Sequence, residues 1–403
     1  MDFAHPAPDE KPSVGLPCSV RVMAEMDEYV LVGGGLQNAL VALALLEQRP
    51  MTRLCLVERE GQLGGNHTWC FHAADVPEAA RPFIDPLVVR RWPAHDVMFP
   101  RRRRRMASAY AALTSERLHQ GVTARLAQAP HARVLRASVR EVLPGRAVLD
   151  DGRELRADLV VDARGPDPAA PSAAGYQKFV GLELELAEGS APEVPRLMDA
   201  TVPQLDGFRF MYVLPFEPER VLIEDTYYST SAALDVPTLR ERVLAYAAGA
   251  GMRVRSVLRE ERGVLPIPNL LEPDQSAAQL VHAGYGGGLF HPTTGYSLPI
   301  ALRFALFLAR HPATETLGRD YRRWRAAHER QARFCLLLNR LMFGAFAPEQ
   351  RYHVLERFYG LPESTIRRFY ALDMHAGDRA RILCGRPPRG FSLRRMLAGG
   401  LPA

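Results

Sequence analysis

The 403-residue chain has few lysines, no paired cysteines and no long apolar run. Lys11 and Lys178 are the only lysines, so the 51 basic residues are almost all arginine, and the net charge of +6 does not by itself indicate nucleic acid as a partner. The five cysteines form no C-x-x-C pair and no tight cluster with histidine, which argues against a disulfide framework and against a metal site. A reducing cytoplasm fits this composition. The cysteines are Cys18, Cys55, Cys70, Cys335 and Cys384.

The sequence also lacks the patterns of a membrane span and of a signal peptide. Residues 29–46 carry no charge, but they include three glycines together with Gln37 and Asn38. This is typical of a strand, a turn and a helix, whereas a spanning helix needs about 20 apolar residues. The first 25 residues hold several prolines and no apolar h-region. We therefore expect a disordered tail over residues 1–25, with Met26 as an alternative start.

The overall composition is that of a folded protein with unevenly distributed charge. Hydrophobic residues make up 47% of the chain and charged residues 24%, close to the globular average. From residue 319 to the end, 17 arginines stand against seven acidic residues, a net charge of +10, so residues 1–318 carry about −4. A basic C-terminal region on a slightly acidic body suggests an anionic surface as partner, and a membrane face is one candidate.

The front of the chain has the layout of a dinucleotide-binding fold. YVLVGGG (29–35) predicts a buried parallel strand ending in glycines, a helix follows, and RLCLVE (53–58) predicts a second strand. Glycines let the backbone approach a pyrophosphate at a helix N-terminus, and the acid at the end of the second strand can accept from ribose hydroxyls. The amide of the asparagine at the third glycine position is available to a phosphate or a flavin edge. The predicted contacts here are Gly33, Gly34, Gly35, Asn38 and Glu58.

Three later segments extend this site and favour FAD. REGQLGGNHTWCFH (59–72) follows the ribose acid with two glycines, ADLVVDARG (157–165) predicts a late strand, and residues 283–309 join a glycine-rich turn to an apolar helix. Such a turn can direct helix N-terminal amides at a phosphate or at the flavin ring, although it could equally serve packing. Segments separated by long insertions favour FAD over NAD, whose binding fold is usually contiguous.

Between residues 175 and 262 the pattern alternates with period two, which predicts antiparallel strands. FVGLELEL (179–186) is one strand, and FRFMYVLP (208–215) and VLIEDTYY (221–228) form a hairpin. Successive side chains on a strand point to opposite faces, so either Glu224 or Asp225 meets the interior.

A carboxyl held among aromatic residues has a raised pKa and can donate a proton near pH 7. The alternative is that Glu224, Asp225, Glu183 and Asp199 face solvent or pair with Arg209. The alternation does not decide which reaction such a carboxyl would serve.

Five motifs together resemble the bacterial lycopene beta-cyclase family. The resemblance runs from Gly33 to Pro388, includes GRPPRG (385–390) and leaves out the N-terminal 25 residues. In that family a glycine pair followed by asparagine is usual at the front turn, as it is here. The five motifs are GGNHTW (64–69), MDATV (198–202), LIEDTYY (222–228), FHPTTGYSLP (290–299) and RFYGLP (357–362).

The resemblance implies an α/β fold of the aromatic-hydroxylase type. A Rossmann-like FAD-binding domain would carry an inserted antiparallel β-sheet substrate domain and a helical C-terminal region. We expect the FAD-binding domain to comprise residues 26–175 and 262–312. The substrate domain would then comprise residues 176–261, and a membrane-facing region residues 313–403.

The resemblance also implies an isomerase (an intramolecular lyase) with no net redox change. It would protonate the terminal double bond of lycopene, close the ring through a carbocation and release a proton, giving beta-carotene through gamma-carotene. Glu224 would be the acid, Asp199 would support it, and Glu183 would be a third candidate. Reduced FAD would stabilise the cation, with NADPH or another reductant preparing the flavin.

Further candidate cofactor contacts fall in the later segments. Core packing is the alternative for the histidines among them, and Arg117 opens a helix-like stretch from which it could reach a phosphate. The arginine run 101–105 is more typical of a solvated loop than of a site. The additional candidates are Gly64, Gly65, Asn66, His67, Arg117, Asp162, His291, Pro292, Thr293, Thr294 and Gly295.

The helix expected over residues 334–346 is apolar apart from Arg340, yet too short to span a bilayer. It could dip Leu336, Leu337 and Phe343 into one leaflet, or it could cover the substrate cavity. The expected partners are lycopene and related linear carotenes, the inner face of the cell membrane as a peripheral contact, and other carotenoid-pathway enzymes, with no nucleic acid.

Two rival functions fit the same scaffold. One is an FAD-dependent polyprenoid reductase or monooxygenase, since fold alone does not fix chemistry. The other is a carotenoid-binding protein with a vestigial nucleotide domain. The strand that bears the predicted acid separates the first rival from a cyclase, because a hydroxylase needs no buried proton donor.

Overall fold

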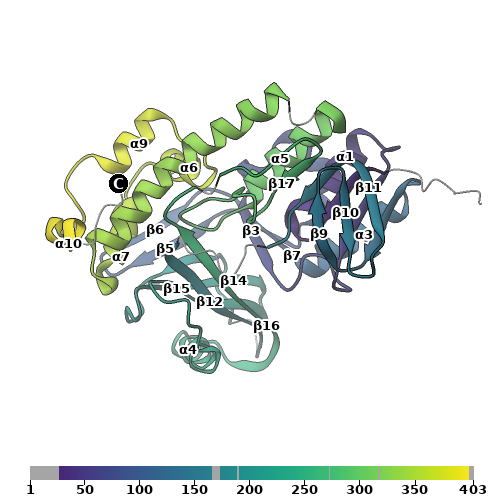
Figure 1. Ribbon diagram of the computed structural model, residues 1–403. Helices are drawn as coiled ribbons and strands as arrows, with labels where there is room; N and C mark the ends of the chain where they lie inside the picture. Colours follow the sequence, from purple (N-terminus) through teal and green to yellow (C-terminus); the bar gives the residue numbers. More distant parts are fainter. Residues whose placement is uncertain (1–26, 166–172, 188–189, 272, 316–317, 399–403) are drawn as a thin grey trace, which may run out of the picture.

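The computed structural model describes residues 27–165, 173–187, 190–271, 273–315 and 318–398. The predicted N-terminal tail lies outside the described residues. Two seven-stranded sheets and one three-stranded sheet form the body, and helices of the C-terminal region run across one side of it (Figure 1). This arrangement confirms the predicted α/β class.

The first sheet contains the predicted nucleotide-binding strands, in the order β8-β2-β1-β11-β10-β9 with β17 beside β11. Strands β1, β2, β8, β11 and β17 run parallel. The side chains of β1, of β2 and of the second half of β11 are buried on both faces, which explains their continuous apolar runs. The strands are β1 (Asp27–Val32), β2 (Leu54–Glu58), β8 (Ala132–Arg136), β9 (Val139–Leu143), β10 (Arg146–Leu149), β11 (Glu154–Asp162) and β17 (Leu280–His282).

The second sheet has the order β16-β12-β15-β14-β13-β5-β6 and contains the predicted hairpin. One of its faces packs on helix α4 through Val180, Leu182, Met211, Leu239 and Val243, and the other face turns toward the first sheet. The strands are β5 (His95–Phe99), β6 (Arg102–Met106), β12 (Ala173–Leu186), β13 (Arg196–Asp199), β14 (Phe208–Glu217), β15 (Arg220–Ser229) and β16 (Val254–Pro268).

The second sheet crosses the domain boundaries expected from the sequence. Strands β5 and β6 lie in the segment assigned to the FAD-binding domain, yet β5 pairs with β13. Strand β16 continues past the expected boundary at residue 261, because β12 is long enough to pair with it as far as Pro268. The arginine run expected as a loop forms β6, where Arg105 pairs with Asp96 on β5.

The remaining elements connect and cover the sheets. Helices α1 and α5 pack against each other beside the first sheet, and α6 passes over β12 and β16 (Figure 1). The small sheet is β3 (Thr68–His72), β7 (Tyr110–Thr114) and β4 (Arg90–Trp92). The α-helices are α1 (Leu36–Gln48), α2 (Arg81–Ile84), α3 (Ser115–Ala127), α4 (Val236–Gly249), α5 (Leu298–Arg310), α6 (Arg319–Ala345), α7 (Tyr352–Phe358), α8 (Glu363–Tyr370), α9 (Ala376–Leu383) and α10 (Leu393–Ala398).

The short 3₁₀ helices are η1 (Ala73–Asp75), η2 (Glu78–Ala80), η3 (Asp85–Leu87), η4 (Ala313–Glu315) and η5 (Pro348–Gln350). Across the described residues, no helix combines the length and the apolar character that crossing a membrane requires.

Candidate active site

A cavity of about 990 Å³ is lined by residues of all three sheets. This is the upper end of the usual range for ligand sites, about 300–1,000 Å³. One end is formed by the glycine turn between β1 and α1 and by the carboxylate of Glu58. The other end is formed by the hairpin residues Phe210, Tyr212 and Glu224. A single space therefore joins the predicted cofactor site to the predicted acid.

The glycine turn at the first end leaves its backbone open to a ligand. Gly33 has φ +91°, and a Cβ atom there would lie 3.1 Å from the carbonyl oxygen of Ala163, so a side chain is disfavoured. Gly35 is different, because a Cβ atom there would meet no protein atom within 4 Å and would point into open space. Next to it, the buried Oε1 of Gln37 has no hydrogen-bond partner within the described part of the chain.

Half of the predicted cofactor contacts border this cavity. They are Gly33, Gly35, Glu58, Gly64, Gly65, His67, Thr294 and Gly295. The predicted contacts outside the lining are Gly34, Asn38, Asn66, Arg117, Asp162, His291, Pro292 and Thr293.

Side chains in the second group mostly bind protein atoms. The amide of Asn38 donates to the carbonyls of Val32 and Val161 at 2.9 and 3.2 Å, which ties α1 to β1 and β11. Arg117 donates to the carbonyl of Pro86 at 2.9 Å. Asp162 pairs with Arg164 at 2.7 Å.

His291 is a core residue in this structure. Its Nε2 lies 2.9 Å from the carbonyl of Phe369, and burial lowers its pKa to about 3, so the ring is neutral at pH 7. Thr293 donates to the carbonyl of Cys335, and the carbonyl of Pro292 accepts from Asn339. These residues hold the turn before α5 against α6.

The hairpin presents Glu224 to the cavity and turns Asp225 away from it, as the alternation predicted. Glu224 pairs in register with Tyr212, and both line the cavity. Asp225 is fully buried on the other face, where it accepts two hydrogen bonds from Arg209 at 2.7 and 3.0 Å. Burial, followed by the neighbouring carboxylate of Glu261, raises the pKa of Glu224 well above its usual value. The shift favours the neutral, protonated form of Glu224.

Asp199 and Glu183 do not border the cavity. Asp199 accepts from Tyr246 of α4 at 2.7 Å and from Thr201 at 2.5 Å, so it lies on the α4 face, as Asp225 does. The expected support of Glu224 by Asp199 is absent from this arrangement. Asp199 pairs with Met211 of β14, the strand between β13 and β15, and Met211 shares its face with Asp225 and not with Glu224. Glu183 lies on the same face as Glu224 but is bound by Arg220 and Arg259.

The acid end of the cavity is walled mainly by aromatic rings. Burial raises the pKa of Tyr110, Tyr212 and Tyr370 well above the usual value, so these phenols are neutral. Their hydroxyls bind neighbouring hydroxyls, Tyr110 to Tyr212 at 2.9 Å and Tyr359 to Tyr370 at 2.7 Å. The aromatic lining comprises Trp69, Tyr110, Phe179, Phe210, Tyr212, Tyr228, Tyr285, Tyr296, Tyr359 and Tyr370.

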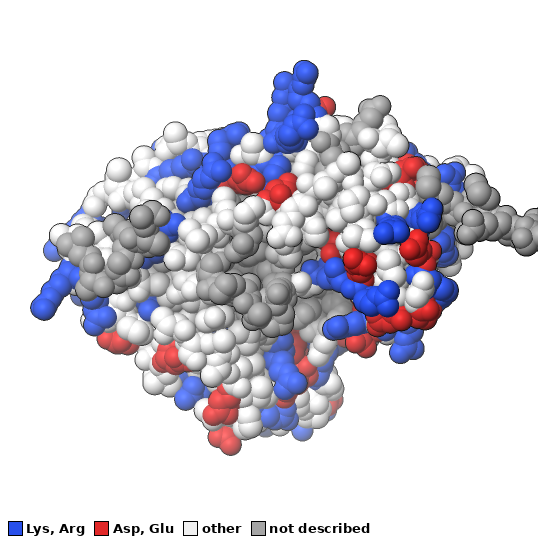
Figure 2. All heavy atoms as spheres, in the orientation of Figure 1, with Lys and Arg blue, Asp and Glu red and all other residues white. Residues whose placement is uncertain are grey.

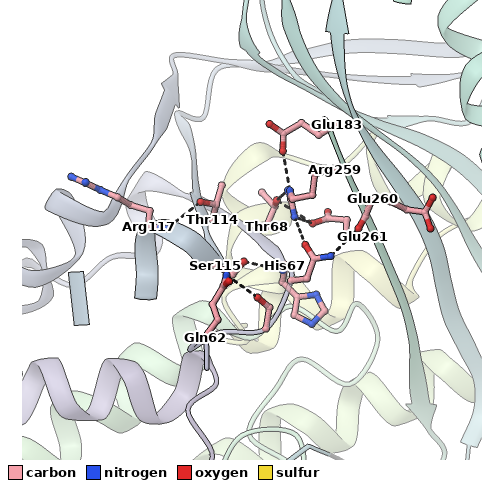
Figure 3. A network of polar contacts seen from close by, with 12 residues as sticks. Gln62, His67, Thr68, Thr114, Ser115, Arg117, Glu183, Arg259, Glu260 and Glu261 are labelled. Atoms are coloured by element: carbon pink, nitrogen blue, oxygen red, sulfur yellow. Dashed lines mark hydrogen bonds and ion pairs between the residues drawn. The ribbon is translucent and has the colours of Figure 1, made fainter. Parts of the chain in front are cut away.

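Arg259 on β16, which was not among the predicted site residues, links the GGNHTW motif to strands β12 and β16 (Figure 3). Its guanidinium donates to Asn66 at 2.9 Å and to Thr68 at 2.7 Å. It also forms ion pairs with Glu183 at 2.9 Å and with Glu261 at 2.7 Å. The alternation of Arg259 and Glu261 in REERG (259–263) predicts that both side chains lie on one face of a strand. Their position beside the site depends on the pairing of β16 with β12.

Several solved structures that align with this chain are described as flavin-dependent enzymes. A probable FAD-dependent monooxygenase from Pseudomonas aeruginosa aligns with a TM-score of 0.58 at 18% identity, over 83% of this chain and 99% of that protein. A geranylgeranyl bacteriochlorophyll reductase-like protein from Thermoplasma acidophilum aligns with a TM-score of 0.61 at 12% identity, over 93% and 95%. At these identities the likeness defines the class of fold, that of the FAD-dependent monooxygenases.

Sequence comparison defines the family within this class. The family described as "Lycopene cyclase protein" matches residues 28–396. The lycopene beta-cyclase of Pseudescherichia vulneris is 41% identical over 372 residues, and that of Pantoea ananas is 41% identical over 365 residues. Each alignment covers 90% of this chain and 95% of the relative. The chain belongs to the lycopene cyclase family, which confirms the resemblance found in its motifs.

Proposed function

We propose that the protein is a lycopene beta-cyclase that converts lycopene through gamma-carotene to beta-carotene. The observation that carries the proposal is the position of the Glu224 carboxyl, whose pKa is raised by burial, at the aromatic end of a cavity that also reaches the glycine turn. An alkene is a very weak base, so its protonation requires a neutral acid in a site that excludes water.

The reaction balances with Glu224 as both acid and base. Its carboxyl gives a proton to the terminal double bond, and the neighbouring carbon becomes a cation. An internal double bond then attacks this cation and closes the ring. The cation formed by closure loses a proton to the Glu224 carboxylate, which restores the acid and leaves a ring double bond. Neutral tyrosine rings stabilise the cation through their π faces and offer no phenolate to trap it.

FAD fits the other end of the cavity. The space above Gly35 admits a pyrophosphate, the carboxylate of Glu58 borders it, and the unpartnered Oε1 of Gln37 is available to the cofactor. Bound in its reduced form, FAD would supply negative charge that stabilises the carbocation. The proposal includes NADPH or another reductant to maintain that form.

Expression in cells that accumulate lycopene tests the function. We expect beta-carotene, whose mass equals that of lycopene, because cyclisation rearranges bonds without adding or removing atoms. Chromatography with mass spectrometry of the extracted pigment measures this. A product heavier by oxygen would instead identify a monooxygenase, and one heavier by hydrogen would identify a reductase. Recovery of unchanged lycopene would favour a carotenoid-binding protein.

The C-terminal region supports a further proposal, that the protein contacts the cytoplasmic face of the membrane. Exposed arginines lie along α6 and beside α10 (Figure 2). Leu383, Phe391 and Leu393 are exposed in the same region, at 45%, 39% and 55%. Of the residues expected to enter the leaflet from α6, Leu336 is buried, whereas Leu337 is exposed at 39%. The α9–α10 segment offers the better apolar contact.

Liposome sedimentation tests this contact. Binding should increase with the anionic lipid fraction and weaken with salt, since charge attraction is screened within about 10 Å at 0.1 M. Replacing Leu383, Phe391 and Leu393 with Ser should weaken binding about tenfold even at low salt, because apolar burial acts independently of charge. The control replaces other exposed apolar residues, namely Met51, Val134 and Leu258. Equal effects of the two triple variants would exclude α9–α10 as the contact.

A further inference from the structure

Glu224 and Glu261 meet above a glycine of β12, the strand next to the edge strand β16 of the second sheet. Strand β12 lies between β15 and β16, and Gly181 pairs in register with Glu224 on one side and with Glu261 on the other. A Cβ atom on Gly181 would lie 2.8 Å from Cγ of Glu224 and 3.1 Å from Cγ of Glu261. The missing side chain therefore gives the two carboxyls room to approach each other across β12.

The surrounding charges balance without Glu224. Arg220 and Arg259 both bind Glu183, and Arg259 also binds Glu261, whose side chain is almost fully buried. Two guanidinium groups thus match two carboxylates. A third carboxylate beside this neutral cluster would be a buried charge without a partner, which is strongly disfavoured. The proton is therefore expected on Glu224, and Glu261 remains the anion.

We propose that Glu261 is a positioning residue that accepts a hydrogen bond from protonated Glu224 and keeps the proton on that residue until substrate arrives. This inference rests on the proposed cyclase function and adds a residue to it. Thr68 donates to the same Oε2 of Glu261 that binds Arg259, at 3.2 Å, so that oxygen is already engaged. The GGNHTW motif thereby helps to orient the carboxyl pair.

Apart from Arg220, Arg259 and Glu183, the titratable groups that face the pair are neutral at pH 7. Burial raises the pKa of Tyr212 on β14 and of Cys70 on β3, and burial lowers the pKa of His67 in the loop before β3. The charges that act on Glu224 come from β16, where Glu261 raises its pKa and Arg259 lowers it. Replacing Glu261 therefore removes a carboxylate that favours protonated Glu224 and leaves Arg259, which favours the ionised form.

The test is Glu261→Gln, which keeps the shape and removes the charge. Activity requires protonated Glu224, so it is lost as pH rises through the pKa of that group. We expect the variant to lose activity at a pH about one to three units lower than the wild type, while the rate at acidic pH stays within a few-fold. Glu260→Gln is the matched control, because that side chain points away and pairs with Arg240. Its profile should match the wild type.

Two further measurements keep the test decisive. Gly181→Ala should shift the profile in the same direction by separating the carboxyls. Infrared difference spectra against Glu224→Gln detect the protonated carboxyl without substrate, so they report on the pair even if the protein proves not to cyclise lycopene. An unchanged pH dependence of the carboxyl signal in Glu261→Gln would overturn the proposal. Loss of activity at every pH with that signal unaltered would overturn it as well.

Discussion

Replacing Glu224 with glutamine is expected to lower the rate of lycopene cyclisation about a thousandfold or more, while the protein remains folded and retains FAD. The amide has nearly the same shape as the carboxyl but cannot release a proton to an alkene. It can still donate a hydrogen bond to the Glu261 carboxylate, so packing above Gly181 is preserved. Conversion of lycopene tests the expected loss of rate. The melting temperature and the FAD content of the purified variant test whether the fold and cofactor binding are retained.

Glu217→Gln is the matched control, because Glu217 lies at the exposed end of β14 in the same hairpin. It makes the same change of side chain without touching the cavity, so the wild-type rate is expected. If Glu224→Gln converted lycopene at near the wild-type rate, another carboxyl would be the acid. Glu261 would then be the first candidate, ahead of Asp199 and Glu183, because only it among these three approaches Glu224.

The nucleotide-binding end was predictable because its signals are local. The nucleotide-binding motif lies within about 30 residues and consists of β1, the glycines, α1, β2 and Glu58. The local sequence of each segment predicts its secondary structure. Individual side chains were harder to predict. The amides of Asn38 and Asn66 suit a cofactor equally well, yet both bind backbone carbonyls of the protein. Residue type alone cannot distinguish these uses.

At the end of the cavity that contains Glu224, local patterns predicted which face of the hairpin each side chain occupies. They did not predict which residues contact Glu224. Alternation placed Glu224 and Asp225 on opposite faces, and the structure confirms it. The roles expected for Asp199 and Glu183 depended on which strands lie side by side. The pairing of β12 with β15 and β16 joins Gly181 to residues 43 and 80 positions farther along the chain. Only that pairing brings Glu261 to Glu224, and the period-two pattern of each strand does not tell which strands are neighbours in the sheet.

Replacing Gly35 with valine is expected to weaken FAD binding about ten- to a hundredfold without destabilising the fold. Gly35 has extended backbone angles that any residue adopts, and its Cβ direction points into open space. The protein therefore tolerates the side chain, whereas a pyrophosphate close to this backbone would meet it, at a cost of about 1–3 kcal/mol. Titration of the apoprotein by flavin fluorescence gives the affinity.

Gly249→Ala, also open but distant from the cavity, should bind like the wild type. Equal affinity of Gly35→Val and the wild type would place the cofactor elsewhere.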